Sequence, residues 1–263
     1  MNLNSQKLTL DYPVSVIPMG EIGGYQVRPG LFDSNGATAS EVGVNFTVHT
    51  QNGHSCELLL FHKGEEEPYA ILPFPDEYKV GDVYAMIVFG LKIEDFEYAY
   101  RIDGEYQPDK GLVFNKDAIL LDPYARAVTG QEIWGEKMVK HYHARVVKDE
   151  FDWGDMPQSS RKLSDLVIYE LHVRGFTYHP SSGVKFPGTF AGIREKIPYL
   201  KELGINAVEL MPIFEFDETM NSRNVGGKTL LDYWGYNTVS FFAPNSNYAS
   251  TVEFNREGTE LKE

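Results

Sequence analysis

The apolar stretch LVIYELHV at residues 166–173 decides the fold of the second half of the chain. A second apolar stretch, NAVELMPI, follows at residues 206–213. Between them, Thr189 is a suitable N-cap, and apolar side chains recur after it at helical spacings of three and four. These side chains are Phe190, Ile193, Ile197, Leu200 and Leu203. A strand, a helix and a second strand predict a βαβ unit, with a right-handed crossover if the strands are parallel.

Two residues bear on the extent of this helix. Gly204 supplies the left-handed conformation that often ends a helix. Pro198 lies inside the pattern, where a proline removes a backbone hydrogen bond and costs about 3 kcal/mol, so we expect a kink there. A further amphipathic pattern at residues 252–263 predicts the first turns of another helix.

The first half of the chain has the pattern of strands rather than helices. Apolar residues alternate with polar or small ones at residues 42–48 and 96–102. Two nearly continuous apolar runs lie between them, at residues 56–61 and 83–89, and turn-forming residues bound each run. Short strands separated by turns predict an antiparallel β-sandwich.

The chain changes character near residue 160. A polar stretch there contains Pro157, Gln158, Ser159 and Ser160. We therefore expect a β-sandwich domain at residues 1–155, a linker at 156–165, and a second domain that contains the βαβ unit at 166–263.

Composition and charge limit the classes of partner. The 263 residues are 42% hydrophobic and 24% charged, as in ordinary globular proteins. Thirty-eight acidic and 24 basic side chains give a formal charge of -14, which repels polyanions, so we expect neither nucleic acid nor a membrane as a partner. The single cysteine, Cys56, lies in an apolar run and is expected to be buried. With no signal-peptide pattern, this predicts a cytoplasmic protein.

Several short motifs do not carry the chemistry that they suggest. Residues 226–229 resemble the end of a phosphate-binding loop, but Ser222 stands where that loop needs a glycine. The glycines near residue 23 lack the spacing of a dinucleotide-binding turn. His141 and His143 could share one side of a strand, yet no third ligand is apparent. We therefore expect no cofactor and no metal site in this chain.

Charged and aromatic residues remain as candidates. If the sheet of the second domain is a parallel barrel, side chains at the carboxyl ends of its strands face the active-site mouth. Those on or after the two strands are Glu170, His172, Arg174, Glu209, Glu215, Asp217 and Glu218. The alternative is a set of structural ion pairs. The aromatic segment at residues 231–237 fits sugar stacking and core packing equally well, while Phe241 and Phe242 look like core.

These stretches, taken together, resemble the debranching branch of the α-amylase superfamily, glycoside hydrolase family 13, of the isoamylase and bacterial glycogen-debranching type. The resemblance rests on residues 167–177, 179–183, 188–192, 196–204, 206–213 and 233–237. Residues 42–46 and 120–125 are similar to the glycogen-binding-type, immunoglobulin-like module of the family. The resemblance implies a sandwich followed by the start of a (β/α)8 TIM barrel, truncated after strand two.

The resemblance also implies an activity and a site. The family hydrolyses α-1,6 branch linkages in glycogen or a related α-glucan, with retention of configuration. Tyr236 matches the tyrosine that stacks on the sugar beside the scissile bond, and Trp234 lies in the same loop. The family's catalytic carboxylates come from later barrel strands, so we expect no catalytic residue in this chain and no activity from it alone. The alternatives are a non-catalytic α-glucan-binding protein, or the same part of a pullulanase or branching enzyme.

Overall fold

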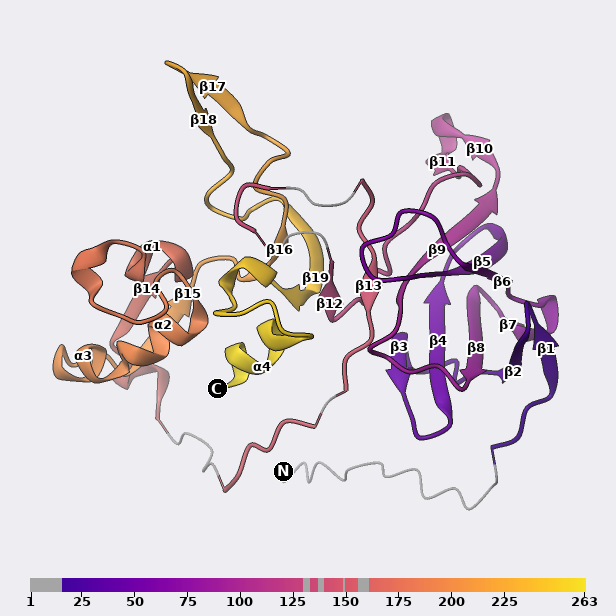
Figure 1. Cartoon of the computed structure of the whole chain (residues 1–263), viewed down its shortest axis with the longest axis horizontal. Coiled ribbons are helices and arrows are strands. Elements are labelled where there is room, and N and C mark those ends of the chain that lie inside the picture. The colour runs from indigo at the N-terminus through magenta and orange to yellow at the C-terminus, as the bar shows by residue number, and fades with distance from the viewer. Residues whose placement is uncertain (1–15, 130–132, 137–139, 149, 156–160) are drawn as a thin grey trace.

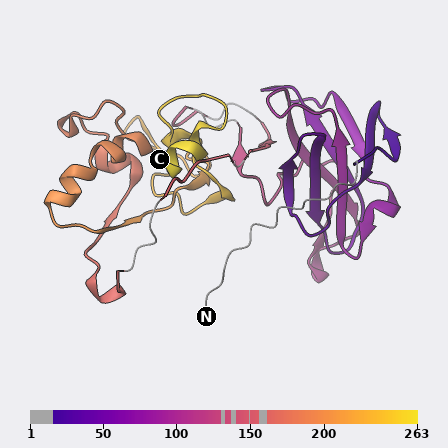
Figure 2. The same cartoon turned by 90° about the horizontal axis from the view of Figure 1, so that it is seen from below.

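The computed structural model describes residues 16–129, 133–136, 140–148, 150–155 and 161–263. These residues form two lobes, one built from antiparallel sheets and one that combines short helices with small sheets (Figure 1 and Figure 2). Half of the expected linker, residues 156–160, lies outside the described part of the chain. A short 3-10 turn, Leu163–Asp165 (η3), then leads into the second lobe.

The larger sheet of the first lobe has six strands within the described residues. They are Gly20–Ile22 (β1), Tyr25–Pro29 (β2), Gly36–Ala39 (β3), Gly43–His49 (β4), Lys79–Val80 (β7) and Val83–Phe89 (β8). The order is β1-β2-β8-β4-β3, and β7 also pairs with β8. Every pair is antiparallel, and β3 is the last strand on its side.

The second sheet of this lobe has five strands in the described part of the chain, in the order β12-β13-β9-β5-β6. They are Gly53–Phe61 (β5), Ala70–Pro73 (β6), Glu97–Gly104 (β9), Ala127–Val128 (β12) and Ala144–Arg145 (β13). Smaller elements are Asp76–Tyr78 (η1), Pro108–Lys110 (η2), and the paired strands Tyr106–Gln107 (β10) and Leu112–Val113 (β11). The predicted antiparallel strands are therefore confirmed.

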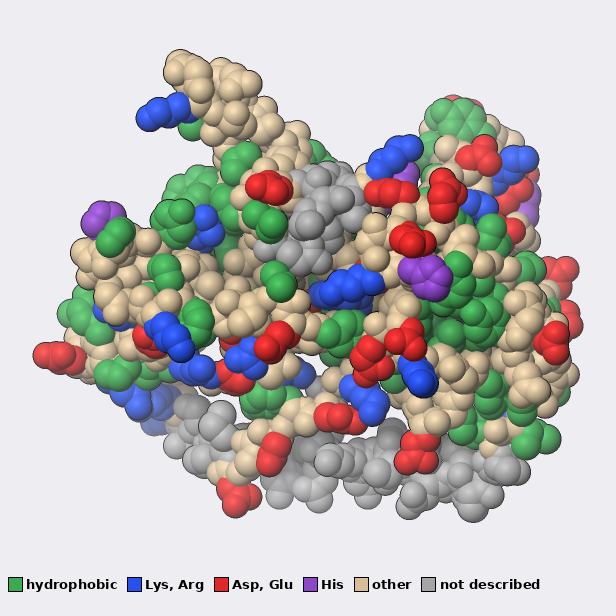
Figure 3. All heavy atoms as spheres, viewed as in Figure 1, with side chains coloured by type: hydrophobic (Ala, Val, Ile, Leu, Met, Phe, Trp, Pro, Cys, Tyr) green, Lys and Arg blue, Asp and Glu red, His purple; other side chains and the backbone are tan. Residues whose placement is uncertain are grey.

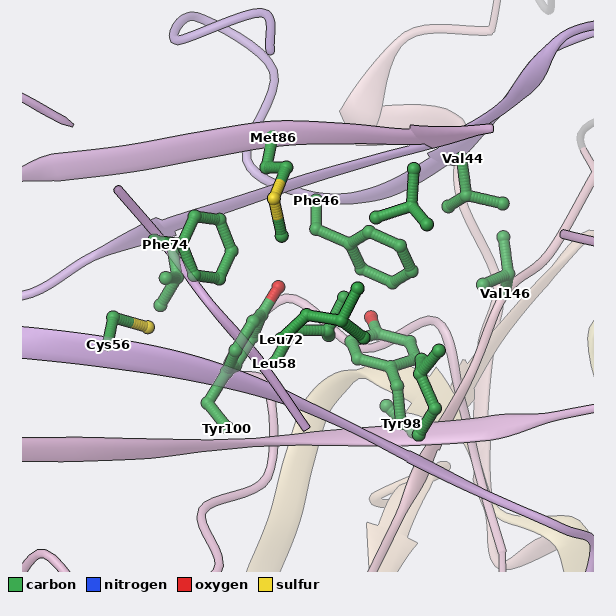
Figure 4. Close-up of a cluster of buried hydrophobic side chains, with 14 of the residues drawn as sticks. Val44, Phe46, Cys56, Leu58, Leu72, Phe74, Met86, Tyr98, Tyr100 and Val146 are labelled. Carbon is green, nitrogen blue, oxygen red and sulfur yellow. The ribbon is translucent and has the colours of Figure 1, made fainter. Parts of the chain in front are cut away.

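The two sheets share one hydrophobic core, because the alternating strands turn their apolar side chains toward one another (Figure 4). Phe46 of β4 meets Tyr98 of β9 edge to face, with ring centroids 5.1 Å apart. Met86 of β8 and Leu58 of β5 are fully buried in the same cluster. Cys56 is also buried there, as expected, and burial raises the pKa of its thiol, so it is a packing residue rather than a nucleophile.

The second lobe contains the predicted parallel pair. Its strands are Ile168–Leu171 (β14) and Ala207–Leu210 (β15), and Glu170 lies opposite Glu209. The helices are Val173–Thr177 (α1), Phe190–Glu195 (α2), Ile197–Glu202 (α3) and Arg256–Lys262 (α4), with the turns Pro180–Ser182 (η4) and Ser246–Tyr248 (η5). None of the helices in the described residues has the length and apolar character required to span a membrane.

Two antiparallel ribbons complete this lobe. Phe214–Phe216 (β16) pairs with Thr238–Pro244 (β19), and Arg223–Val225 (β17) pairs with Lys228–Leu230 (β18). The β17–β18 ribbon projects away from the rest of the lobe (Figure 1). Along the chain, this ribbon is followed by residues 231–237, which lead back into β19.

The expected single helix with a kink at Pro198 is instead two short helices. Lys196 ends α2 and precedes α3 with φ -94° and ψ 0°. Pro198 consequently lies in the first turn of α3, where a missing N–H breaks no helical hydrogen bond. Leu200 is buried, whereas Ile197 and Leu203 are 42% and 53% exposed, so the predicted apolar face is only partly covered.

The lobes are joined by polar contacts made from residues beside β12 and β13. Arg145 forms a buried ion pair with Glu257 of α4. Asn255 donates its amide N–H to the carbonyl of Val146 at 2.9 Å, and Ser240 of β19 donates its hydroxyl to a carbonyl of the first lobe at 3.0 Å. Because an unpaired buried charge is costly, these contacts hold β19 and α4 against the sandwich.

Asp122 is a carboxylic acid at the centre of the first lobe. It is fully buried, and its two oxygens accept hydrogen bonds from the Tyr98 hydroxyl at 2.7 Å and the Tyr124 N–H at 2.8 Å. Burial raises its pKa from 3.8 to about 6, against the lowering effect of these two donors. The folded state therefore holds this proton over a pH range in which the unfolded chain releases it.

We predict that the contribution of Asp122 to the free energy of unfolding falls by about 3 kcal/mol as the pH rises from about 4 to about 6. Because the pKa is higher in the folded state, the stabilisation is complete at pH values below the pKa of the unfolded chain. It is lost as the pH rises through the pKa of the folded state. Urea unfolding at several pH values compares the natural chain with Asp122→Asn, and with Asp109→Asn as an exposed control. A difference between the natural chain and Asp122→Asn that stays constant across this range contradicts the assignment.

Candidate functional site

Residues 231–237 form an exposed aromatic loop between β18 and β19, called here the aromatic loop. Trp234 is 54% exposed and Tyr236 is 73% exposed, which are large fractions for such apolar rings. Among the described residues, Tyr236 has no hydrogen bond and no ring partner. Core packing is therefore wrong for Trp234 and Tyr236, whereas Tyr233 is 36% exposed and packs on His172 and Trp134.

The loop is held by His172, which follows β14. The imidazole lies flat on the ring of Tyr233, with centroids 4.3 Å apart and planes 9° apart. Its Nδ1 accepts the Gly175 N–H at 3.0 Å, so the proton sits on Nε2, which donates to the Tyr233 carbonyl at 2.7 Å. Burial lowers the pKa of His172, which favours this neutral ring. His172 therefore serves as an anchor for the loop.

Gly235 lets the loop turn sharply between the two exposed rings. Its φ is +76°, a left-handed conformation that side chains other than glycine rarely adopt. A Cβ atom at this position would also lie 2.9 Å from the ring of Phe216. The backbone thus approaches the buried ring closely, between the exposed side chains of Trp234 and Tyr236.

Beneath the aromatic loop lies a small cluster of rings around Trp134. Trp134 meets Phe216 and Tyr233 edge to face, at 6.0 Å and 6.2 Å between centroids. The guanidinium of Arg174 lies 4.3 Å from the Trp134 ring centroid, a cation–π contact. Trp134 comes from the sandwich half of the chain and has no sequence neighbour in this cluster, so no pattern in the sequence pointed to its role.

The candidate carboxylates separate into two groups. Glu215, Asp217 and Glu218 are buried on or after β16 and accept hydrogen bonds from other parts of the chain. The Ser246 N–H reaches Glu215 at 2.9 Å, and the Tyr142 hydroxyl reaches Asp217 at 2.5 Å. These contacts tie β16 to η5 and to the first lobe.

Burial strongly affects the protonation of this buried group. It raises the pKa of Glu215 well above its ordinary value and that of Glu218 to about 7. Glu218 also accepts from the Asn247 amide at 2.7 Å and from the Gly135 N–H at 3.4 Å. Two of the three acids thus have the neutral form favoured by their surroundings, and all three accept hydrogen bonds within the fold.

The other group is exposed. Glu170 and Glu209 occupy opposite positions in the parallel pair, and Arg174 lies beyond them on α1. Neither glutamate has an ion-pair partner in the part of the chain that the structure describes. Side chains in register on neighbouring strands point to the same face, so this face carries two like charges side by side.

Three further expectations concern residues outside the aromatic loop. Phe241 and Phe242 are 66% and 55% exposed, so the interpretation as core is wrong. Phe242 stacks on Tyr124, at 5.3 Å between centroids, and more than half of its surface stays exposed. His143 is fully buried: its Nδ1 lies 3.2 Å from Glu97, and its ring stacks on Phe61 at 3.8 Å. That buried position separates it from the half-exposed His141.

We predict that Gly235→Ala destabilises the fold by about 2–4 kcal/mol, because it adds the left-handed backbone penalty to a clash with Phe216. Gly226→Ala is the matched control: its φ is +58°, but a Cβ there meets nothing within 4 Å, so we expect a loss of about 1–2 kcal/mol. Urea unfolding of both variants measures the difference. Equal losses would show that the loop can move off Phe216.

Comparison with known proteins gives a consistent result. Residues 34–125 match the model of carbohydrate-binding module 48, the isoamylase N-terminal domain. The chain is 38% identical to the chloroplastic isoamylase 1 of Arabidopsis thaliana over 90% of its own length and 32% of that protein. It is 33% identical to the glycogen debranching enzyme of Salmonella paratyphi B, over 87% of its own length and 36% of that enzyme.

The solved structures agree on the fold. A type I pullulanase from Bacillus subtilis, solved with maltose, superposes with a TM-score of 0.65 at 24% identity, covering 89% of this chain and 31% of that one. The chain spans about a third of the length of the curated relatives that it matches. The predicted resemblance to debranching enzymes is confirmed: residues 34–125 carry a carbohydrate-binding module 48, and nearly the whole chain is similar to the corresponding part of isoamylases and glycogen debranching enzymes.

Proposed function

We propose that this chain is the sugar-binding front part of an enzyme that hydrolyses α-1,6 branch linkages in glycogen or a related α-glucan. The observation that carries the proposal is the aromatic loop: Tyr236 is 73% exposed on a backbone that His172 and Phe216 hold in place. A rigid exposed ring offers a flat apolar surface to the face of a pyranose, at little entropic cost. The resemblance places Tyr236 beside the scissile bond, with Trp234 in the same loop.

The exposed parallel pair supports a barrel origin for the second lobe. Val167, Ile168 and Val208 are 51%, 51% and 41% exposed, although parallel sheets are normally covered on both faces. A (β/α)8 barrel needs roughly 250 residues, and the matched part of this chain spans only 32% and 36% of the two relatives. We therefore infer a sandwich at residues 1–155, a linker at 156–165, and the first two strands of a TIM barrel within 166–263.

The catalytic groups of the proposed enzyme lie outside this chain. A retaining glycosidase needs a nucleophilic carboxylate and an acid about 5 Å apart at the scissile bond. Glu215, Asp217 and Glu218 accept hydrogen bonds inside the fold, which suits a structural role better than this chemistry. The proposed role of the chain is to bind and orient the sugar next to that bond, where stacking that strengthens in the transition state raises the rate.

The charge of the chain suits the proposed substrate. A neutral polysaccharide needs no electrostatic attraction, so a formal charge of -14 does not oppose its binding. Stacking and hydrogen bonds supply the affinity. A cytoplasmic location stays a prediction, since the Arabidopsis relative is named as chloroplastic.

A second candidate is an α-glucan-binding protein without hydrolytic activity. The carbohydrate-binding module at residues 34–125 favours it, because such a module can act by binding alone. The corresponding part of a pullulanase or a branching enzyme is a third. Product analysis on a branched glucan with the full-length protein separates them: hydrolysis releases linear chains, branching transfers chains, and a binder leaves the polymer unchanged.

We predict that Tyr236→Ala lowers the debranching turnover of the full-length protein about tenfold, since a lost aromatic stack of about 1.5 kcal/mol corresponds to that factor. Tyr236→Phe keeps the ring and should keep most of the rate. Tyr106→Ala removes an equally exposed ring, 70% exposed, from the β10–β11 ribbon and serves as the control. If Tyr106→Ala and Tyr236→Ala reduce turnover alike, the site assignment fails.

We also predict that the 263-residue chain alone releases no reducing ends from glycogen, because it lacks the two catalytic carboxylates. A reducing-sugar assay at high protein concentration, beside the full-length protein, measures this. If the isolated chain reproducibly releases reducing ends and Glu218→Gln abolishes this release, the prediction is wrong and the buried acids are catalytic.

A further inference from the structure

The β17–β18 ribbon is left uncovered by the part of the chain that the structure describes. All six of its strand residues are exposed, and it projects from the second lobe (Figure 1). A Cβ atom at Gly226 or Gly227, in the turn between the strands, would meet nothing within 4 Å. At the base, the Asp232 N–H donates to the Glu218 carbonyl at 2.8 Å. The ribbon is therefore fixed at its base, and its tip stands clear of the lobe.

The two faces of the ribbon differ in their chemistry. Arg223 lies opposite Leu230 and Val225 lies opposite Lys228, so these four side chains share one face, called here the ribbon face. Val225 and Leu230 are 57% and 49% exposed. The opposite face carries a polar pair that is joined by a hydrogen bond of 3.1 Å. The ribbon face therefore presents two apolar side chains and two cations to solvent.

The charge of the ribbon is opposite in sign to that of the chain. Residues 219–231 contain two basic side chains and no acidic one, whereas the whole chain has a formal charge of -14. Neither Arg223 nor Lys228 forms an ion pair with another described residue. On the side seen in Figure 3, the projecting ribbon carries blue side chains and no red ones. The ribbon face therefore fits an acidic surface that also exposes apolar groups.

The sandwich lobe of the same chain has a surface of this kind. Residues 16–129 carry 18 acidic and 8 basic side chains. Glu65 and Glu67 are exposed shortly before Tyr69 and Ile71, which are 38% and 41% exposed at β6. The Tyr69 ring is supported by a stacked imidazole, with centroids 4.2 Å apart. These two acids and two apolar side chains, called here the acidic patch, complement the two cations and two apolar side chains of the ribbon face.

The ribbon face does not meet the acidic patch of its own chain. The ribbon projects from one lobe, and β6 belongs to the other lobe, at the opposite side of the view in Figure 1. We propose that the ribbon face docks on the acidic patch of a second copy of this protein. In a twofold dimer each copy supplies one ribbon and one patch, so the contact forms twice and the assembly closes. This interface is independent of the proposed function.

The dimer is expected to be weak and sensitive to salt. Four side chains on each surface make a small interface, in the class of transient complexes. Added salt screens charges that remain close to solvent. Raising the salt concentration from about 0.05 M to about 0.5 M should therefore raise the dissociation constant of the dimer about tenfold.

Sedimentation velocity of the full-length protein over a series of concentrations measures this dissociation constant. The double variant Arg223→Glu and Lys228→Glu places acids against the acidic patch and should raise the constant at least about tenfold. The double variant Lys185→Glu and Lys201→Glu is the matched control, since it makes the same change of charge at exposed lysines of the same lobe. It should leave the constant within about twofold of its original value.

A charge swap tests which surface the ribbon meets. Adding Glu65→Lys and Glu67→Lys to the double variant of the ribbon restores opposite charges across the contact and should recover the dimer. All the substituted positions are exposed, so the melting temperatures of the variants should stay unchanged.

The outcomes separate this proposal from the proposed function. A full-length protein that stays monomeric overturns the proposal, and so does equal weakening of the dimer by the two double variants. A charge swap that fails to recover the dimer also overturns it, because the ribbon then meets a surface other than the acidic patch. A protein that dimerises in this way but cleaves no branched glucan refutes only the proposed function, whereas an active monomer refutes only the dimer.

Discussion

The geometry of the second lobe depends on the stacked pair of His172 and Tyr233. A neutral imidazole that donates from Nε2 to the Tyr233 carbonyl and accepts the Gly175 N–H at Nδ1 leaves the ring a single orientation. That orientation ties the end of β14 to a loop more than sixty residues later in the chain. The exposure of Trp234 and Tyr236 follows, because their backbone cannot fold inward while Tyr233 is held.

The aromatic loop is supported from the first lobe as well. Trp134 packs under Tyr233 and Phe216, and the guanidinium of Arg174 makes a cation–π contact with its ring. The buried ion pair of Arg145 and Glu257 joins the same two halves further along. A substitution in the sandwich half can therefore disturb the aromatic loop without touching it, since the contacts that hold the loop cross between the lobes.

Much of the local structure could be predicted from the sequence, because it depends on near neighbours. The alternation at residues 42–48 became β4, and the two apolar stretches of the second half became the parallel pair. The helix was predicted at the right residues, but the structure has two short helices there instead of one. Spacing alone cannot distinguish a kinked helix from two helices, and the proline took the first turn of the second one, where it loses no hydrogen bond.

Burial was harder to predict than secondary structure. Phe241 and Phe242 are apolar neighbours in a strand, a pattern typical of core, yet both are more than half exposed. His143, which could share one side of a strand with His141, is buried against Phe61. Whether a side chain is covered depends on segments far away in the sequence, and strand periodicity carries no information about them.

The sequence by itself determined the main strands of the sandwich, the two strands of the parallel pair and the place of the helical segment between them, together with the resemblance that singled out Trp234 and Tyr236. Only the tertiary structure decided which aromatic rings reach the surface and that the acids on and after β16 are buried. The physical reason is the distance along the sequence over which each effect acts. Periodicity and turn chemistry act over a few residues, whereas exposure and pKa depend on atoms brought together from positions that can lie more than a hundred residues apart.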